Sequence, residues 1–212
     1  MQGFFITFEG PEGCGKSTQI AMLADRLRAS GHAEVVTTRE PGGTPAGEAI
    51  RGILQHDTAG SDICAAAETL LFEASRAQLV QRVIRPALKR GAIVLCDRFA
   101  DSTTAYQGYG RGFDIGELLQ LHAFALGGTW PDITLLLDLD AEHGFRRIQA
   151  RNGGTTGFDR MERESQEFHQ RVVAGFREMA SRWPERFRRI DATGSVAAVH
   201  EAVWAIVGEV LS

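Results

Sequence analysis

Short apolar runs alternate with longer segments of helical periodicity along the whole chain. Five runs have the length and the β-branched or aromatic content of strands, at 4–9, 33–38, 92–98, 133–138 and 187–190. Between and after them, helical spacing of apolar residues predicts helices at 19–28, 46–54, 65–89, 101–106, 114–126, 142–150, 160–182 and 196–211. Strands that alternate with helices indicate right-handed βαβ units. The pattern therefore predicts an α/β fold, with a parallel five-stranded sheet that is flanked by helices.

Glycine, proline and capping residues indicate where these elements end. Pro86 is expected to break or kink the 65–89 helix near its end. Asp101 or Ser102 is expected to cap the helix that follows the third strand. The glycine-rich segment 108–112 is predicted to be a loop. Because no repeat, low-complexity run or linker interrupts the pattern, residues 1–212 are predicted to form a single domain.

A glycine-rich loop follows the first strand directly and precedes the first helix. Its residues are Gly10, Pro11, Glu12, Gly13, Cys14, Gly15, Lys16, Ser17 and Thr18, which match the P-loop pattern. Backbone N–H groups of such a loop converge on one spot and favour a polyphosphate, so all nine residues are predicted to bind ATP. Lys16 can reach the β- and γ-phosphates, and the Ser17 hydroxyl can bind Mg²⁺. The alternative, a glycine turn beside a lysine, does not require the flanking strand and helix.

Charged residues follow the strands at the edge where an α/β sheet binds its ligands. Asp97 ends an apolar strand, which beside a P-loop is the usual place of a carboxylate that holds Mg²⁺. Arg98 could bind a phosphate, and the alternative is that the two residues form an ion pair at the strand end. Glu9, Arg39, Asp97–Arg98 and Asp138 are expected to face one common cleft.

Two pairs of residues are open to a functional and a structural interpretation. Phe72 and Arg76 share one helical face and could stack on a base and bind its edge. They could equally be a core Phe beside an Arg that reaches solvent. Arg147 and Arg151 could close over phosphates, or they could form an exposed basic face near a helix end. The residues alone favour the structural interpretation of both pairs.

Composition excludes several classes of function. The net charge of −4 argues against a binder of nucleic acid polymers. No apolar stretch is long enough to span a bilayer, and no signal segment is expected. The cysteines Cys14, Cys64 and Cys96 are odd in number and far apart, which indicates free thiols in a reducing cytoplasm.

Histidine chemistry is not expected. His32, His56 and His200 are predicted to lie on the surface or in loops, and no histidine pair has metal-ligand spacing. Phosphoryl transfer to a phosphate oxygen needs no general base, because the acceptor is already an anion. No catalytic histidine is therefore assigned.

Six motifs in this order make the chain resemble the bacterial thymidylate kinase family over nearly its whole length. They are Phe8-Glu9-Gly10-x-Glu12-Gly13-x-Gly15-Lys16-Ser17-Thr18, Thr38-Arg39-Glu40-Pro41-Gly42-Gly43-Thr44, Leu71-Phe72-x-x-x-Arg76, Asp97-Arg98-Phe99-x-x-Ser102, Ala105-Tyr106-Gln107-Gly108 and Asp159-Arg160-x-Glu162. Each motif alone is weakly specific, whereas the ordered set is highly specific. The resemblance implies phosphorylation of dTMP to dTDP with ATP and Mg²⁺, a step in dTTP biosynthesis.

The same resemblance implies which residues bind dTMP. They are Glu12 at the sugar 3′-hydroxyl, Arg39 and Arg98 at the phosphate, Phe72 stacked on thymine, Arg76 at its O4 edge, Ser102, Thr103 and Gln107 around the base, and Tyr106 against the 2′ carbon. Phe99 departs from the family pattern, since a Tyr or His is common at that position.

The resemblance also implies a mobile lid at roughly 147–160. The P-loop holds no arginine between Pro11 and Cys14, so the catalytic arginine is expected in the lid. Arg151 is the expected catalytic arginine and acts with Lys16, Arg98 and Glu12. Arg147 and the loop residue Thr193 are expected near the ATP. Ser17 and Asp97 are the expected metal ligands, and a homodimer is implied by resemblance only.

Three alternatives stay open from the sequence. Another nucleoside monophosphate kinase would prefer a different acceptor. A deoxynucleoside kinase would need a carboxylate base near a free hydroxyl, and Glu9 could serve. A non-enzymatic P-loop module would bind ATP without turnover that depends on an acceptor.

Overall fold

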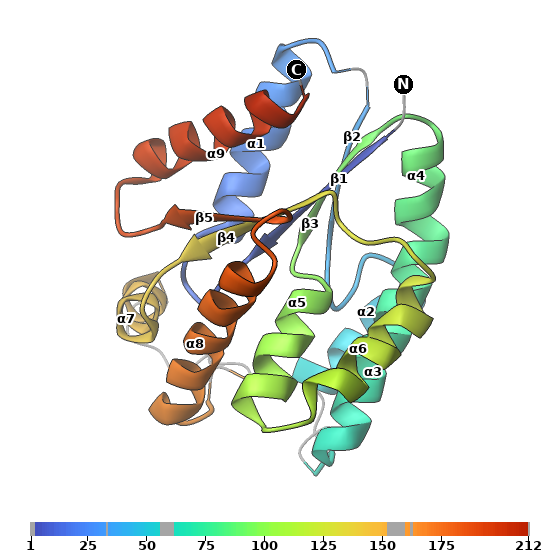
Figure 1. Cartoon of the computed structure of the whole chain (residues 1–212), viewed down its shortest axis with the longest axis vertical. Helices are drawn as coiled ribbons and strands as arrows, with labels where there is room; N and C mark the ends of the chain where they lie inside the picture. Colours follow the sequence, from blue (N-terminus) through green and yellow to red (C-terminus); the bar gives the residue numbers. More distant parts are fainter. Residues whose placement is uncertain (1–2, 33, 56–61, 152–159, 162, 212) are drawn as a thin grey trace.

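A parallel five-stranded sheet lies between helices in the computed structural model of the chain (Figure 1). The structure describes residues 3–32, 34–55, 62–151, 160–161 and 163–211, with Arg151 described by its backbone only. The strands are β1 (Phe4–Glu9), β2 (Val35–Arg39), β3 (Ile93–Asp97), β4 (Ile133–Asp138) and β5 (Phe187–Asp191). Their order in the sheet is β2-β3-β1-β4-β5, with every neighbouring pair parallel. The predicted fold class and the five predicted strands are confirmed.

Helices cover both faces of this sheet. In the described residues they are α1 (Lys16–Ala29), α2 (Pro45–Gln55), α3 (Ala65–Leu79), η2 (Val80–Ile84), α4 (Arg85–Lys89), α5 (Ala100–Thr103), η3 (Thr104–Gly110), α6 (Ile115–Leu126), α7 (Ala141–Arg151), α8 (Gln166–Arg182) and α9 (Val196–Leu211). Side chains of α1 and α9, such as Leu23 and Val203, pack on one face of the sheet. Side chains of α3, η2 and α6, such as Leu79 and Leu126, pack on the other.

The carboxyl ends of β1 and β3 lie side by side between these two layers. The two strands are neighbours in the sheet, with Phe8 opposite Asp97. Helix α1 follows β1 onto one face, whereas α5 follows β3 onto the other, so the chain leaves the two strand ends in opposite directions. Such a divergence is where open α/β sheets bind ligands.

The 65–89 helix does not break at Pro86. Its α-helical geometry changes to π-helical geometry over η2 and returns in α4, where Pro86 lies in the first turn. A proline lacks the N–H that the preceding turn would use, and wider π-type bonding absorbs that gap. The predicted break is therefore a local change in helical pitch.

The loop predicted at 108–112 is confirmed only at 111–112, and the predicted cap at Asp101 or Ser102 is wrong. Gly108 and Gly110 lie inside η3, which continues α5 as a π-helix. Helix α5 begins at Ala100 with no cap from its own side chains. The cap comes instead from β1, because the Glu9 carboxylate accepts hydrogen bonds from the N–H groups of Phe99 (2.7 Å) and Ser102 (3.2 Å).

Two further expectations are corrected. Helix α8 begins at Gln166 instead of residue 160, with Ser165 as its N-cap. His200 is buried on α9 beside Gln19, so its predicted surface position is wrong. Within the described part of the chain, every helix is too short or too polar to cross a membrane.

Candidate active site

The P-loop packs tightly against the sheet and α7. Gly10 (φ 137°) and Gly13 (φ 72°) have backbone conformations that favour glycine, and a Cβ on Gly13 would lie 2.3 Å from the carbonyl oxygen of Gly144. Lys16 bends back across the loop, with Nζ 3.1 Å from the Gly10 oxygen and 2.9 Å from the Pro11 oxygen. The lysine ammonium is therefore held over the loop in which the sequence places a polyphosphate.

Ser17 and Asp97 meet beside the P-loop. The Ser17 hydroxyl donates to Asp97 Oδ2 at 2.6 Å, which joins the start of α1 to the end of β3. One hydroxyl and one carboxylate are the oxygen donors that Mg²⁺ takes from a protein when phosphates and water complete its coordination. The described residues contain no group of three His, Cys, Asp or Glu side chains that could hold a metal by themselves. The donor set thus fits Mg²⁺ shared with a phosphate ligand.

Arg98 links the P-loop to the neighbouring helix. Its backbone has a positive φ of 66°, a strained conformation for a residue other than glycine. One Nη atom lies 3.2 Å from the Gly10 oxygen and 3.0 Å from Ser102 Oγ. The other lies 2.6 Å from Glu12 Oε1 and 3.2 Å from the Tyr106 hydroxyl. Burial of Glu12 opposes ionisation, but the positive charges of Arg98 and Lys16 outweigh it and lower the pKa of Glu12 to about 2.

A cleft opens beside Arg98 and runs between α3, α5 and η3. It encloses about 430 Å³ when its open mouth is included, which is the size of a small-molecule site. Its lining residues are Glu12, Glu40, Pro41, Gln55, Phe72, Arg76, Arg98, Phe99, Ser102, Thr103, Tyr106, Gln107 and Met161. The lining combines aromatic rings with two guanidinium groups, which suits a planar ring that carries an anionic group.

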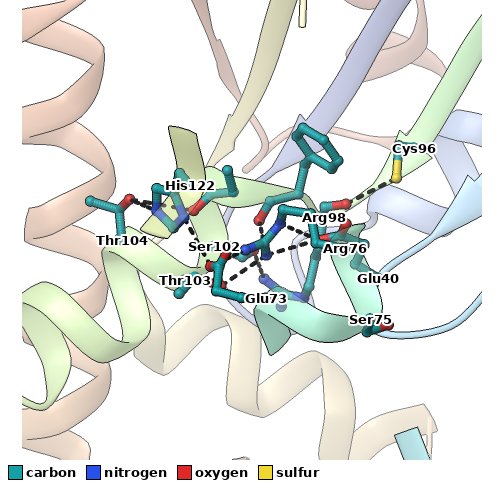
Figure 2. A network of polar contacts seen from close by, with 12 residues as sticks. Glu40, Glu73, Ser75, Arg76, Cys96, Arg98, Ser102, Thr103, Thr104 and His122 are labelled. Atoms are coloured by element: carbon teal, nitrogen blue, oxygen red, sulfur yellow. Dashed lines mark hydrogen bonds and ion pairs between the residues drawn. The ribbon is translucent and has the colours of Figure 1, made fainter. Parts of the chain in front are cut away.

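Arg76 lines this cleft, is almost fully buried and belongs to a network of polar contacts (Figure 2). Its Nε donates to Glu40 Oε2 at 2.8 Å, and Nη1 pairs with Glu73. Its Nη2 donates to the Phe99 carbonyl at 3.2 Å and to Thr103 Oγ1 at 2.9 Å. The structural interpretation of an Arg that reaches solvent is therefore wrong, because the guanidinium is fixed inside the protein.

The network around Arg76 continues to a histidine that the sequence did not indicate. His122 of α6 is fully buried and contacts Glu73 Oε1 at 2.9 Å through Nδ1 and Thr104 Oγ1 at 2.9 Å through Nε2 (Figure 2). It does not line the cleft. The sequence around His122 does not indicate this contact, because its partner Glu73 lies 49 residues away on a different helix.

Glu40 is a second group that the sequence pattern did not single out. It is buried, it lines the cleft, and its Oε1 has no hydrogen-bond partner among the described residues. Burial raises the pKa of Glu40 to about 8, although the neighbouring Arg76 favours the ionised form. The available signal was its place in the Arg39-Glu40-Pro41 motif, in which only Arg39 was assigned a role.

Eight of the nine predicted dTMP-binding residues line the cleft, and Arg39 does not. Arg39 lies at the end of β2 with 53% of its side chain exposed, and its Nη2 is 3.0 Å from Glu48 Oε2. Its assignment to the acceptor phosphate stays a prediction.

Glu9 and Asp138 do not face the cleft, contrary to expectation. Glu9 is fully buried beneath α5, where it accepts from the Ser102 hydroxyl at 2.6 Å in addition to the two backbone N–H groups. Burial and the nearby Asp101 raise the pKa of Glu9 to about 7. Asp138 instead pairs with Arg177 of α8 and Arg189 of β5. Both carboxylates hold elements of the fold together.

The two residues outside the P-loop that are predicted near the ATP come together. Arg147 of α7 donates through Nη2 to the carbonyl oxygens of Ala192 (2.9 Å) and Thr193 (3.3 Å). The Arg151 side chain and residues 152–159 of the predicted lid lie outside the described part of the chain. The catalytic role of Arg151 therefore stays a prediction.

Comparison with known proteins gives a consistent result. A family model described as thymidylate kinase matches residues 8–203. The thymidylate kinase of Thermomicrobium roseum is 52% identical over 208 residues, which cover 98% of this chain and 96% of that protein. That of Gloeobacter violaceus is 52% identical and covers 96% and 93% of the two chains. The crystal structure of thymidylate kinase from Ehrlichia chaffeensis superposes with a TM-score of 0.79 at 34% identity, over 98% of this chain and 99% of that one.

Proposed function

The chain belongs to the thymidylate kinase family, and we propose that the cleft beside its P-loop is where it phosphorylates dTMP. Its reaction is the transfer of the γ-phosphoryl group of ATP to dTMP, which gives dTDP, and it is thus an ATP-dependent nucleoside monophosphate kinase. The observation that carries the proposed location is the position of Arg98. One guanidinium contacts both the P-loop oxygen of Gly10 and the cleft residues Ser102 and Tyr106. A phosphate in the cleft would therefore meet a phosphate on the loop.

The donor nucleotide would occupy the P-loop. Lys16 would turn from the loop carbonyls to the β- and γ-phosphates, and Arg147 and Thr193 would lie toward the adenine. Ser17 and Asp97 would hold Mg²⁺, which when bound neutralises charge on the phosphate oxygens. Arg151 would contribute a further positive charge from the lid at 147–160.

The acceptor nucleotide would occupy the cleft. Arg98 would bind its phosphate, and the ionised Glu12 beside Arg98 would accept a hydrogen bond from the sugar 3′-hydroxyl. Phe72 would stack on the thymine, with Arg76 at its O4 edge. Because the acceptor oxygen is anionic, alignment and charge neutralisation are sufficient, and no general base is needed.

The alternative of a deoxynucleoside kinase has no support from the described residues. Its candidate base, Glu9, is fully buried, and its two oxygens already accept from Phe99 N, Ser102 N and the Ser102 hydroxyl. A free hydroxyl in the cleft would not reach it without displacement of the α5 cap.

The proposal extends to assembly and location. Residues 1–212 would act as a single domain and form a homodimer through α3 and α6, whose adjacent surfaces expose Leu70 (55%) and Phe124 (90%). The free thiols of Cys14, Cys64 and Cys96 fit a reducing cytoplasm.

A coupled assay of ADP release tests the function. Wild-type protein with ATP and Mg²⁺ should turn over dTMP faster than AMP, CMP or GMP, and it should not turn over thymidine. The variant Lys16→Met should lower kcat by at least about 100-fold, because it removes a preorganised charge at the transferred phosphoryl group. The control Lys89→Met, on the exposed end of α4, should not change it. Preference for another monophosphate, or turnover of thymidine, would contradict the proposal.

A further inference from the structure

Glu68 lies behind the base end of the cleft and does not line it. It is on α3, one turn before Phe72, and none of its surface is exposed. Its carboxylate binds the amide nitrogen of Gln107 at 2.8 Å and the Nε of Arg111 at 2.7 Å, and it pairs with Arg160. A buried carboxylate with three partners from separate parts of the chain holds each of them in a defined orientation.

The contact with Glu68 determines which way the Gln107 amide points. An ionised carboxylate can only accept hydrogen bonds, so it binds the NH₂ end of the amide and rejects the carbonyl end. Gln107 is 1% exposed and lines the cleft. No described residue donates to its Oε1. The amide therefore presents a hydrogen-bond acceptor, held on the side away from Glu68.

Two arginines keep the Glu68 carboxylate ionised. Arg111 binds both carboxylate oxygens, at 2.7 and 3.1 Å, and Arg160 pairs with Oε2. Burial opposes ionisation, but these guanidinium groups and Gln107 lower the pKa of Glu68. A protonated carboxyl could donate to the amide oxygen and allow the opposite orientation.

Arg76 supplies the complementary donor. Its Nε–H binds Glu40, its two Nη2–H groups bind Phe99 and Thr103, and one Nη1–H binds Glu73. Among the contacts with described residues, one of the five N–H groups of the guanidinium is left, on Nη1. The cleft thus offers one N–H donor from Arg76 and one acceptor from Gln107. A pyrimidine with a 4-oxo group and an N3–H fits this pair, whereas cytosine presents an amine and an unprotonated nitrogen at the same edge.

We propose that Glu68 is a positioning residue that sets which pyrimidine the cleft accepts, by holding the Gln107 carbonyl oxygen toward the base. The inference rests on the proposed function, because it assumes that a pyrimidine monophosphate binds in this cleft. It assigns to Glu68 a role in discrimination between thymine or uracil and cytosine, without contact with the nucleotide.

The test compares kcat/KM for dTMP and dCMP in Glu68→Gln and in a matched control. The neutral amide of Glu68→Gln can donate or accept, so the Gln107 amide is free to turn. The ratio of kcat/KM for dTMP over dCMP should fall by about tenfold or more, mainly through KM. The reason is that the Gln107 amide, once free to turn, can form a hydrogen bond with either base. The control Glu164→Gln removes the other carboxylate that pairs with Arg111, at 2.8 Å, without touching Gln107, and should keep the wild-type ratio.

A purely structural role predicts a different outcome. Damage to the fold would lower kcat/KM for both substrates equally and leave the ratio unchanged, which would overturn the inference. If Glu68→Gln does not fold, Gln107→Leu decides, because it removes the acceptor and leaves Glu68 paired with its arginines. A wild-type ratio in Gln107→Leu would also overturn the inference. If wild-type protein does not phosphorylate dTMP, the proposed function fails instead.

Discussion

The buried carboxylates around Arg76 are the residues that the sequence indicated least. Their spacing places Phe72 and Arg76 on one helical face, and both side chains line the cleft. Glu73 lies three residues before Arg76 on the same helix, whereas Glu40 and His122 come from other elements and meet this pair only in the folded chain. Local spacing predicts which residues share a helix face, but not which distant side chains neutralise them.

Glu40 makes the stability of the protein depend on pH. Its pKa is about 8 in the folded state and 4.5 without the fold, so the folded protein binds the extra proton between these values. The free energy of unfolding should therefore fall as pH rises from 4.5 to 8, by on the order of a few kcal/mol from this group. Urea denaturation at a series of pH values measures this slope.

The variant Glu40→Gln provides the comparison for that slope. An amide resembles the protonated carboxyl, so the variant and the wild type should have similar stability at pH 4.5, below the window in which Glu40 loses its proton. At pH 8 the variant should be the more stable protein, because it never buries a negative charge. Parallel curves for the two proteins across the whole range would contradict the role given to Glu40.

At the scale of elements, strands were easier to predict than helix ends. All five strands agree with the sequence pattern to within two residues at each end. The three central strands β1, β3 and β4 are continuous apolar runs that are buried on both faces. The last turn of the π-helical element η3, at 108–110, was predicted as a loop because of its glycines. Those glycines serve packing: a Cβ on Gly108 would lie 2.4 Å from Ile115, and one on Gly110 would lie 2.6 Å from Phe168. A sequence cannot distinguish a glycine required for close approach from one required for a turn.

The contact between η3 and α8 gives a test of this explanation. A Cβ on Gly175 of α8 would lie 2.5 Å from the ring of Tyr109, so Gly175→Ala should destabilise the protein by about 1–3 kcal/mol through overpacking. A Cβ on Gly52 of α2 would have no described atom within 4 Å, so Gly52→Ala should stabilise the protein by about 0.4–1 kcal/mol. Thermal or urea denaturation should give opposite signs for the two variants. The same sign for both would contradict the packing argument.

At the scale of the whole molecule, the alternation of strands and helices was sufficient to predict the parallel sheet. That pattern does not indicate an interface between two chains, because the exposed apolar residues occur one at a time along the helices. Phe124→Glu places a charge at the proposed α3 and α6 interface, and the variant should sediment as a monomer at concentrations where the wild type is a dimer. The control Val196→Glu, at the 54% exposed start of α9, should keep the dimer. A wild-type monomer, or an unchanged dimer in Phe124→Glu, would refute this interface.

The end of β1 has a consequence for inhibitor chemistry. Glu9 caps α5, which leads to the cleft, and the next residue, Gly10, begins the P-loop and accepts from Arg98. The two proposed nucleotide sites are thus attached to consecutive residues, the last residue of a buried strand and the glycine that follows it, with no hinge between them. The affinity of a bisubstrate compound that joins adenosine to thymidine should accordingly show a sharp optimum in linker length, because the distance between the two sites is fixed.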